Sequence, residues 1–414
     1  MDQDLQSRMV SAGIGATRVG LKLGAAALFI LAICSPAAAI KIGVLNDQTG
    51  PYSAHTGIGS VDAARMAIED FGGSVLGAPI ELVAADHQNK PDVGLVIARR
   101  WFDTEGVDVI VDVPTSSVAL AVQQLVRDRQ KLVLFSGPGA SDLTGKACSP
   151  FGIAWTYDSY AISAAPVQAA LQAGFKTWYF LTVDFAFGHA IERDATAAIL
   201  AGGGQVIGTT RHPFNTADLS SFLLTAQNSK ASIIGLANAG PDAVNSLKQA
   251  REFGIVAGGQ KIAALLLSII DVHALGLETT QGVLLTESFY WDQNEETRAW
   301  SKRFFDRNKK MPSMLQAGVY GAVTHYLKAV AAVGTGNSAE IRAAMAKLPI
   351  NDFMTTDGQI RADGRVMRDF YVFEVKSPKE SRAAWDYYKL VKTVPAALAA
   401  IPVSESQCDL LRSK

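Results

Sequence analysis

Residues 107–136, VDVIVDVPTSSVALAVQQLVRDRQKLVLFS, contain the pattern that decides the fold. The runs at its two ends, Val107–Val113 and Leu132–Ser136, are rich in valine, isoleucine and leucine, which is typical of strands buried on both faces of a parallel sheet. Between them, Ser116–Arg129 repeats apolar residues at a spacing of four, as at Val118 and Val122, and this predicts an amphipathic helix. The stretch therefore predicts two parallel strands joined by a helix.

The same alternation continues on both sides of this unit. Towards the N-terminus, strands are predicted at Lys41–Asp47 and Ile80–Asp86, and helices at Ser60–Phe71 and Asp92–Thr104. Towards the C-terminus, the predicted strands are Thr177–Asp184, Gln205–Thr210, Ile233–Asn238, Lys261–Leu267, Val283–Phe289 and Asp369–Lys376, with Trp385–Val391 as a possible partner of the last. The predicted helices there are Ser159–Ala173, Ala186–Ala201, Ser220–Asn228, Asp242–Phe253, Glu295–Lys309 and Ser313–Val333.

Repeated units of this kind form parallel sheets with right-handed crossovers. Because four or five units occur twice, the expected fold class is α/β, with two doubly wound parallel-sheet lobes joined by a three-crossing hinge. The crossings are expected near residues 156–159, 286–292 and 355–368. Residues 40–157 and 290–360 would form the first lobe, residues 158–289 and 361–400 the second, and residues 401–414 a C-terminal tail.

The first 39 residues have the features of a secretory signal peptide. Arg8, Arg18 and Lys22 precede an uncharged run, Leu23–Cys34, and small residues follow at Ala37–Ala39. The apolar run is about 12 residues long, whereas a membrane-spanning helix needs about 20, so a retained anchor is the weaker alternative. We expect cleavage near Ala39 and a periplasmic mature protein.

Charge and cysteine content narrow the function classes. Lys and Arg number 38 against 39 Asp and Glu, and no basic block occurs, which argues against a nucleic-acid partner. Cys34 would leave with the signal peptide, so Cys148 and Cys408 remain as an even pair in an oxidising compartment. A disulfide is therefore expected, with two free thiols as the alternative.

Two polar turns follow neighbouring predicted strands, at the edge where doubly wound sheets bind ligands. Pro114 is followed by Thr115, Ser116 and Ser117, which open a helix and offer hydroxyls and free backbone N–H groups to a carboxylate or phosphate. The second turn, Gly137–Ser141, includes Ala140 and exposes backbone beside the first. An ordinary helix cap is the alternative for the first turn, but two such turns side by side favour a binding site.

Further candidates lie at other predicted strand ends. The strand-end and cleft candidates are Tyr52, His55, Asp184, Phe187, Asn238 and Tyr290. Aromatic side chains at a cleft mouth can stack on a ligand, although they can equally serve hinge packing. No G-x-S-x-G, H-E-x-x-H or G-x-x-x-x-G-K-[ST] motif occurs and the six histidines are scattered, so no enzyme, metal or cofactor is expected.

Several of these segments, taken in order, resemble the branched-chain-amino-acid (Leu/Ile/Val) type of periplasmic solute-binding protein, which serves an ABC importer. The matching segments are Ile42–Tyr52 ending in T-G-P, Val111–Val118, S-G-P-G-A-S at Ser136–Ser141, D-F-A-F-G at Asp184–Gly188, A-G-P-D at Ala239–Asp242 and E-F-G-I at Glu252–Ile255. The resemblance implies that a ligand carboxylate is held by Thr115, with Ser116 and Ser117 adjacent, and by Ala140 and Ser141. It also places Phe187 and Asn238 at the ligand, Phe187 without the family's phenol.

One departure from the family bears on the ligand. Members that bind amino acids have an acid after the strand matching Lys261–Leu267, whereas here the next acid is Asp271. A buried ammonium without a counter-charge costs several kcal/mol. Either Asp271 or Asp184 substitutes, or the ligand has no amine and is a hydrophobic or aromatic carboxylic acid, as in the family's aromatic-acid-binding branch.

The resemblance further implies capture by hinge closure, transient docking on an inner-membrane permease and a monomeric state. A branched-chain or hydrophobic amino acid is the alternative ligand. A secreted α/β enzyme and a sensor ectodomain on the same fold are more distant alternatives.

Overall fold

The computed structural model describes residues 39–412, so the predicted signal peptide lies outside the described residues apart from Ala39. Two parallel sheets form the framework. The first has the order β4-β1-β5-β6-β7 and the second the order β11-β10-β8-β9. We call the elements around the first sheet lobe 1 and those around the second sheet lobe 2. The predicted α/β class with two doubly wound sheets is confirmed.

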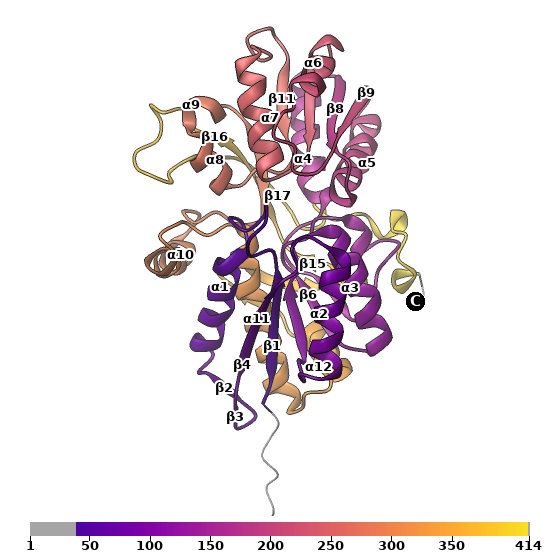
Figure 1. The fold of residues 1–414 in the computed structure, drawn as a ribbon, viewed down its shortest axis with the longest axis vertical. Helices are drawn as coiled ribbons and strands as arrows, with labels where there is room; N and C mark the ends of the chain where they lie inside the picture. The colour runs from indigo at the N-terminus through magenta and orange to yellow at the C-terminus, as the bar shows by residue number, and fades with distance from the viewer. Residues whose placement is uncertain (1–38, 413–414) are drawn as a thin grey trace, which may run out of the picture. The chain divides into compact units, whose positions relative to one another are not determined.

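Lobe 1 is built on five parallel strands: β1 (Lys41–Asn46), β4 (Glu81–Asp86), β5 (Val109–Asp112), β6 (Leu132–Phe135) and β7 (Gly152–Ala154). Its first helices are α1 (Gly57–Asp70), α2 (Pro91–Asp103) and α3 (Ser116–Arg129), and a short hairpin joins β2 (Ser74–Val75) to β3 (Ala78–Pro79). One apolar cluster lies between the sheet and the helices α2 and α3, and another lies between the sheet and α1. Figure 1 accordingly draws α1 on one side of β1 and the helices α2 and α3 on the other. β7 was not predicted, because three residues are too few to show a period.

Lobe 2 repeats this plan with four parallel strands: β8 (Thr177–Val183), β9 (Gln205–His212), β10 (Ile233–Ala237) and β11 (Lys261–Ala264). Its helices are α4 (Ser159–Gln172), α5 (Ala186–Ala201), α6 (Ser220–Asn228), α7 (Pro241–Glu252), α8 (Ile269–Leu275) and α9 (Leu277–Thr280). When the strands of each sheet are numbered by their order in the chain, both sheets have the spatial order 2-1-3-4, and lobe 1 adds a fifth strand at the end. The order therefore reverses between β1 and β5 in lobe 1, and between β8 and β10 in lobe 2, and such points are where doubly wound sheets bind ligands.

The later elements return to both lobes. A three-stranded antiparallel sheet, β12-β16-β17, joins β12 (Leu284–Glu287), β16 (Phe370–Val375) and β17 (Tyr388–Val394). The helices α10 (Glu295–Asn308), α11 (Met314–Val333) and α12 (Ser338–Lys347) follow β12, and α11 packs along α1. The predicted pairing of the last two strands is confirmed, but β17 begins three residues later than expected.

The chain crosses between the lobes three times, after β7, after β12 and before β16. A small antiparallel sheet precedes the third crossing and was not predicted; it contains β13 (Ile350–Asp352), β14 (Thr355–Ile360) and β15 (Val366–Met367). Arg365, between β14 and β15, is buried and forms an ion pair with Asp158, the N-cap of α4. Burial lowers the pKa of Arg365 to about 9, and the nearby charge of Arg368 acts in the same direction.

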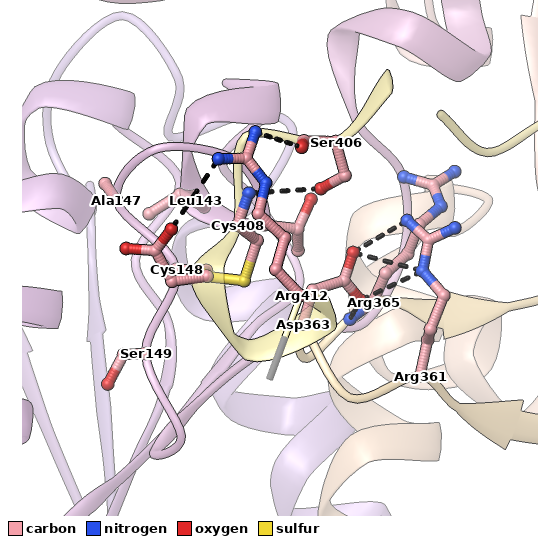
Figure 2. Close-up of a disulfide and its surroundings, with 12 residues drawn as sticks. Leu143, Ala147, Cys148, Ser149, Arg361, Asp363, Arg365, Ser406, Cys408 and Arg412 are labelled. Carbon is pink, nitrogen blue, oxygen red and sulfur yellow. Dashed lines mark hydrogen bonds and ion pairs between the residues drawn. A yellow bond between two sulfur atoms is a disulfide. The ribbon is translucent and has the colours of Figure 1, made fainter. Parts of the chain in front are cut away.

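After β17, the tail returns to lobe 1 and is held there covalently. Cys148 and Cys408 form a disulfide with a Cα–Cα distance of 5.7 Å, so the predicted pairing is confirmed. Arg361 donates to the carbonyl of Ile401 at 2.8 Å, and Arg365 donates to that of Ala399 at 2.8 Å. Figure 2 shows these arginines beside the disulfide. The tail contains two short 3₁₀ turns, Val403–Glu405 and Asp409–Leu411.

Candidate functional site

A cavity of about 40 Å³ lies where the strand-end loops of both lobes meet. Lobe 1 contributes the loops after β1, β5 and β6, and lobe 2 contributes the loops after β8, β10 and β11. Most of the wall is aromatic or aliphatic, formed by Tyr52, Pro114, Tyr157, Phe185, Phe187, Leu266, Met314 and Leu315. An apolar pocket with a few polar groups is the usual form of a small-molecule site.

Main chain at two glycines forms or supports this wall, since Gly240 lines the cavity and Gly139 lies behind the rings of Phe187 and Tyr157. A Cβ at Gly139 would lie 2.6 Å from Phe187 Cε2 and 2.7 Å from Tyr157 Cε2, so only glycine allows both rings to approach. Gly240 has a φ of +56°, and its Cβ would lie 3.2 Å from the ring of Tyr52. Glycine is therefore required at both positions so that the aromatic side chains can pack against these loops.

The polar end of the cavity in lobe 1 is the start of α3. Ser116, the first residue of this 14-residue helix, lines the cavity, and its hydroxyl accepts a hydrogen bond from the N–H of Ala140 at 3.3 Å. The turn before it is strained, because Asp112 and Val113 have φ values of +81° and +52°. Such strain clusters at functional sites. The N-terminal N–H groups of the helix and the Ser116 hydroxyl together suit a carboxylate.

Asp112 ties the ends of three strands together beneath this turn. Its carboxylate accepts hydrogen bonds from Asn46 at 3.2 Å and from Ser136 at 2.9 Å, which lie at the ends of β1 and β6. Burial raises the pKa of Asp112 to about 6, although the hydrogen bonds from Ser136 and Asn46 act in the opposite direction. The carboxylate therefore holds the strand ends in register at the edge of the cavity.

The other polar group of the cavity is an ion pair between the lobes. His55 Nε2 lies 2.8 Å from Asp271 Oδ1, and both residues are buried and line the cavity. Asp271 Oδ2 also accepts from the N–H of Ser268 at 2.9 Å and from its hydroxyl at 3.0 Å, as part of the capping box of α8. The acid nearest the ligand space is therefore already paired with a basic side chain of the protein.

The pKa values of the two partners shift in opposite directions. Burial lowers the pKa of His55, but the charge of Asp271 and its hydrogen bond outweigh burial, so the net pKa is raised. Burial raises the pKa of Asp271, but the charge and hydrogen bond of His55 and the bonds from Ser268 leave it lowered. Both shifts favour an imidazolium–carboxylate pair.

Four of the predicted site residues line the cavity: Tyr52, His55, Ser116 and Phe187. Three other predicted residues from lobe 1 lie beside the cavity without lining it. The hydroxyl of Thr115 donates to Asn89, that of Ser117 is buried without a hydrogen-bond partner among the described residues, and Ala140 lies behind Ser116.

Ser141 contacts the opposite lobe instead of the cavity. Its hydroxyl donates to Asp194 at 2.7 Å and accepts from Arg193 at 2.6 Å, and both partners belong to α5. Arg193 also donates to Asp142 at 3.1 Å, and Ser159 donates to Asp194 at 2.5 Å. This network joins the loop after β6 to lobe 2.

The remaining predicted residues lie away from the cavity wall. Asp184 is exposed and pairs with His189 at 2.8 Å. Asn238 is buried and donates to Ser246 at 3.0 Å, while its neighbours Ala239 and Gly240 line the cavity. Tyr290 donates to the carbonyl of Trp385 at 3.1 Å, which corresponds to the hinge-packing alternative.

Sequence reasoning missed part of the wall, namely Tyr157, Phe185, Leu266, Ser268 and Ser313–Leu315. Tyr157 lies at the predicted first crossing, and Phe185 directly follows the predicted strand Thr177–Asp184. An aromatic residue at each of these boundaries was the signal available in the sequence. Ser313–Leu315 begins a helix that is distant in sequence from every strand end, and no local pattern marks it as part of a site.

Comparison with known proteins agrees with this geometry. The family model described as periplasmic binding protein matches residues 39–381. The chain belongs to this family. Its members are ligand-binding proteins of ABC transporters, of the branched-chain amino acid type, rather than enzymes. Among residues 39–412, no helix combines the length and apolar character needed to cross a bilayer.

Three solved structures illustrate the similarity of this periplasmic binding protein to its relatives. One from Burkholderia mallei is 47% identical, with a TM-score of 0.88, and the match covers 90% of this chain and 99% of the other. A branched chain amino acid ABC transporter periplasmic ligand-binding protein from Burkholderia xenovorans is 41% identical, with a TM-score of 0.81 and coverage of 90% and 100%. A solute-binding protein from R. palustris in complex with benzoate is 21% identical, with a TM-score of 0.79 and coverage of 90% and 99%, which shows the fold alone.

Proposed function

We propose that the protein captures a small aromatic or hydrophobic carboxylate between its lobes and delivers it to an ABC permease in the inner membrane. The observation that carries the ligand class is the ion pair between His55 and Asp271. An α-ammonium group needs an unpaired buried carboxylate, and in this cavity the carboxylate is neutralised by the protein itself. Asp184, the other candidate for this role, is exposed and paired with His189.

The rest of the cavity supports the same ligand class. The cavity, at about 40 Å³, is smaller than the usual small-molecule site of about 300–1,000 Å³, so the lobes would have to part to admit the ligand. Aromatic side chains from both lobes, including Tyr52, Tyr157 and Phe187, would then enclose its apolar ring. Ser116 and the N-terminus of α3 would hold the carboxylate. Because the walls come from both lobes, ligand contacts would favour a closed form, as hinge closure requires.

A branched-chain amino acid is the second candidate, and the position of Asp271 in the cavity favours it. In that case the ligand ammonium would replace His55 at the carboxylate. The name of the Burkholderia xenovorans relative is consistent with this candidate.

Calorimetric titration of the mature protein with benzoate, cinnamate and leucine tests the proposal. We expect the aromatic acids to bind and leucine to bind far more weakly. Ser116→Ala should weaken acid binding by about 1–3 kcal/mol, because part of the carboxylate loses a partner. Thr115→Val is the matched control, since its hydroxyl serves Asn89, and it should change affinity less.

His55→Leu separates the two candidates. It leaves Asp271 buried and unpaired, so leucine should gain affinity through its ammonium group if our proposal is correct. Tight leucine binding by the unmodified protein, with no response to either acid, would refute the proposed ligand class and support the amino acid.

A further inference from the structure

Three aromatic side chains contact one another across the boundary between the lobes, and we call them the aromatic bridge. Tyr52 lies in the loop after β1 of lobe 1, whereas Phe185 and Phe214 lie in the loops after β8 and β9 of lobe 2. The ring centroids of Tyr52 and Phe214 are 5.6 Å apart, and the rings of Phe214 and Phe185 are stacked at 5.1 Å. Both separations fall in the range of about 4.5–7 Å at which aromatic rings attract one another.

Phe214 differs from its two neighbours in its position relative to the cavity. Tyr52 and Phe185 line the cavity, and Phe214 is not part of the wall. All three side chains are half-buried. Phe214 therefore packs behind one wall residue of each lobe and offers no surface to a ligand.

A buried carboxylate holds each of the two loops whose rings meet between the lobes. In lobe 1, Asp47 accepts a hydrogen bond from the N–H of Tyr52 at 2.7 Å. In lobe 2, Asp242 accepts from the N–H groups of Asn215 and Thr216 at 3.0 and 2.7 Å, directly after Phe214. Both carboxylates are at most 2% exposed. Each ring is thus fixed to its own lobe, so separation of the lobes would pull Tyr52 and Phe214 apart.

Tyr52 makes a second contact with lobe 2. A Cβ at Gly240, in the loop after β10, would lie 3.2 Å from its ring. The Tyr52 ring therefore packs against two loops of the opposite lobe. The contact between Phe214 and Phe185 lies within lobe 2 and would persist after opening. The bridge is consequently broken at one point only, between Tyr52 and lobe 2.

We infer that Phe214 is a positioning residue for ligand retention, which braces Tyr52 from outside the cavity and so favours the closed form of the lobes. This inference rests on the proposed capture of a ligand between the lobes. A contact made in the closed form alone shifts the equilibrium towards that form. Loss of the Phe214 ring therefore favours opening and speeds ligand escape. It leaves the choice of ligand to Ser116 and to the ion pair of His55 and Asp271.

Small-angle X-ray scattering of the mature protein without added ligand tests the brace directly. Phe214→Ala should fold, because the side chain is half-buried and lies in a loop, and it should raise the radius of gyration. Phe214→Tyr keeps the ring and should restore the original value. Phe222→Ala is the matched control, since Phe222 is half-buried and packs on His212 within lobe 2. An equal radius of gyration in Phe214→Ala and the unmodified protein would overturn the inference.

A double variant tests whether the effect passes through Tyr52. Tyr52→Leu removes the lobe 1 ring of the bridge. If Phe214 acts on the lobes through that ring, Phe214→Ala should cause no further rise in the radius of gyration of Tyr52→Leu. The same rise in both backgrounds would refute the bracing of Tyr52.

Stopped-flow fluorescence then measures the rate at which benzoate leaves the protein. Dissociation should be about two- to tenfold faster in Phe214→Ala, which is the range expected for one lost aromatic contact, and unchanged in Phe222→Ala. An unchanged rate in Phe214→Ala would overturn the inference. Leucine is measured in the same way, so that an incorrect ligand class does not conceal the effect. Failure of both compounds to bind would refute the proposed function, whereas the scattering result would still decide the role of Phe214.

Discussion

Removal of the disulfide should lower the free energy of unfolding by several kcal/mol. Cys148 and Cys408 are 260 residues apart in sequence, so the bond closes a very long loop in the unfolded chain. With the chain-entropy relation, a loop of this length gives about 5.6 kcal/mol at 25 °C, which is an upper limit because denatured chains retain structure. We expect a loss of about 2–5 kcal/mol in the double variant Cys148→Ser, Cys408→Ser.

Urea unfolding, followed by fluorescence and by circular dichroism, measures this loss. The variant should fold, because Arg361 and Arg365 still bind the tail carbonyls of Ile401 and Ala399. The urea concentration at the midpoint should fall. The transitions seen by fluorescence and by circular dichroism must coincide for the free energies of unfolding to be compared. The unmodified protein treated with reductant is the control and should match the variant. A free energy of unfolding within about 0.5 kcal/mol of that of the oxidised protein would refute the loop-entropy reasoning.

Three further predictions concern the lobes and the cavity. The ion pair of His55 and Asp271 should stabilise the protein most between about pH 4 and 6.5. The pKa of His55 is raised, so its contribution to stability is lost as the pH rises through that pKa. The pKa of Asp271 is lowered, so its contribution is lost as the pH falls through that pKa. The difference in Tm between the unmodified protein and His55→Gln should therefore shrink from pH 5.5 to pH 8.5, and a constant difference would contradict the pairing. Arg193→Ala removes the contacts with Ser141 and Asp142 between the lobes and should weaken ligand binding by at most about fivefold, since Arg193 is 46% exposed. Arg129→Ala, which breaks a similar pair within lobe 1, should not weaken it, and equal effects in calorimetry would show that the contact between the lobes is irrelevant. Gly139→Ala should reduce ligand affinity at least tenfold by displacing Phe187 and Tyr157, whereas Gly336→Ala, with its nearest neighbour at 3.6 Å, should not; unchanged binding in Gly139→Ala would place the ligand elsewhere.

The fold was largely predictable because its signal is local. The strands around Val109–Asp112 and Leu132–Phe135 are apolar on both faces, and the helix between them has one apolar stripe. Elements without such a signal were missed. β14 carries polar residues at most positions, and α12 is short and mixed in composition, so neither has a clear period.

The candidate site was only partly predictable, because its polar contacts join distant residues. Thr115 and Ser116 are adjacent hydroxyl residues, and only the rotation of α3 decides that Ser116 lines the cavity. The partner of His55 is 216 residues away, and the partner of Ser141 is 53 residues away on the other lobe. Sequence spacing indicates which loops meet, but not which side chains are already hydrogen-bonded to other side chains of the protein.

The main chain of Gly240 forms part of the cavity wall, and that of Gly139 lies directly behind the wall rings of Phe187 and Tyr157, which limits how this pocket can be redesigned. A wall without a side chain has nothing left to trim, so any replacement there can only shrink the space. Larger ligands would have to be accommodated by shortening the facing residues, such as Tyr52 or Phe187. Selection for a new compound should accordingly accumulate changes on the aromatic side and leave the two glycines untouched.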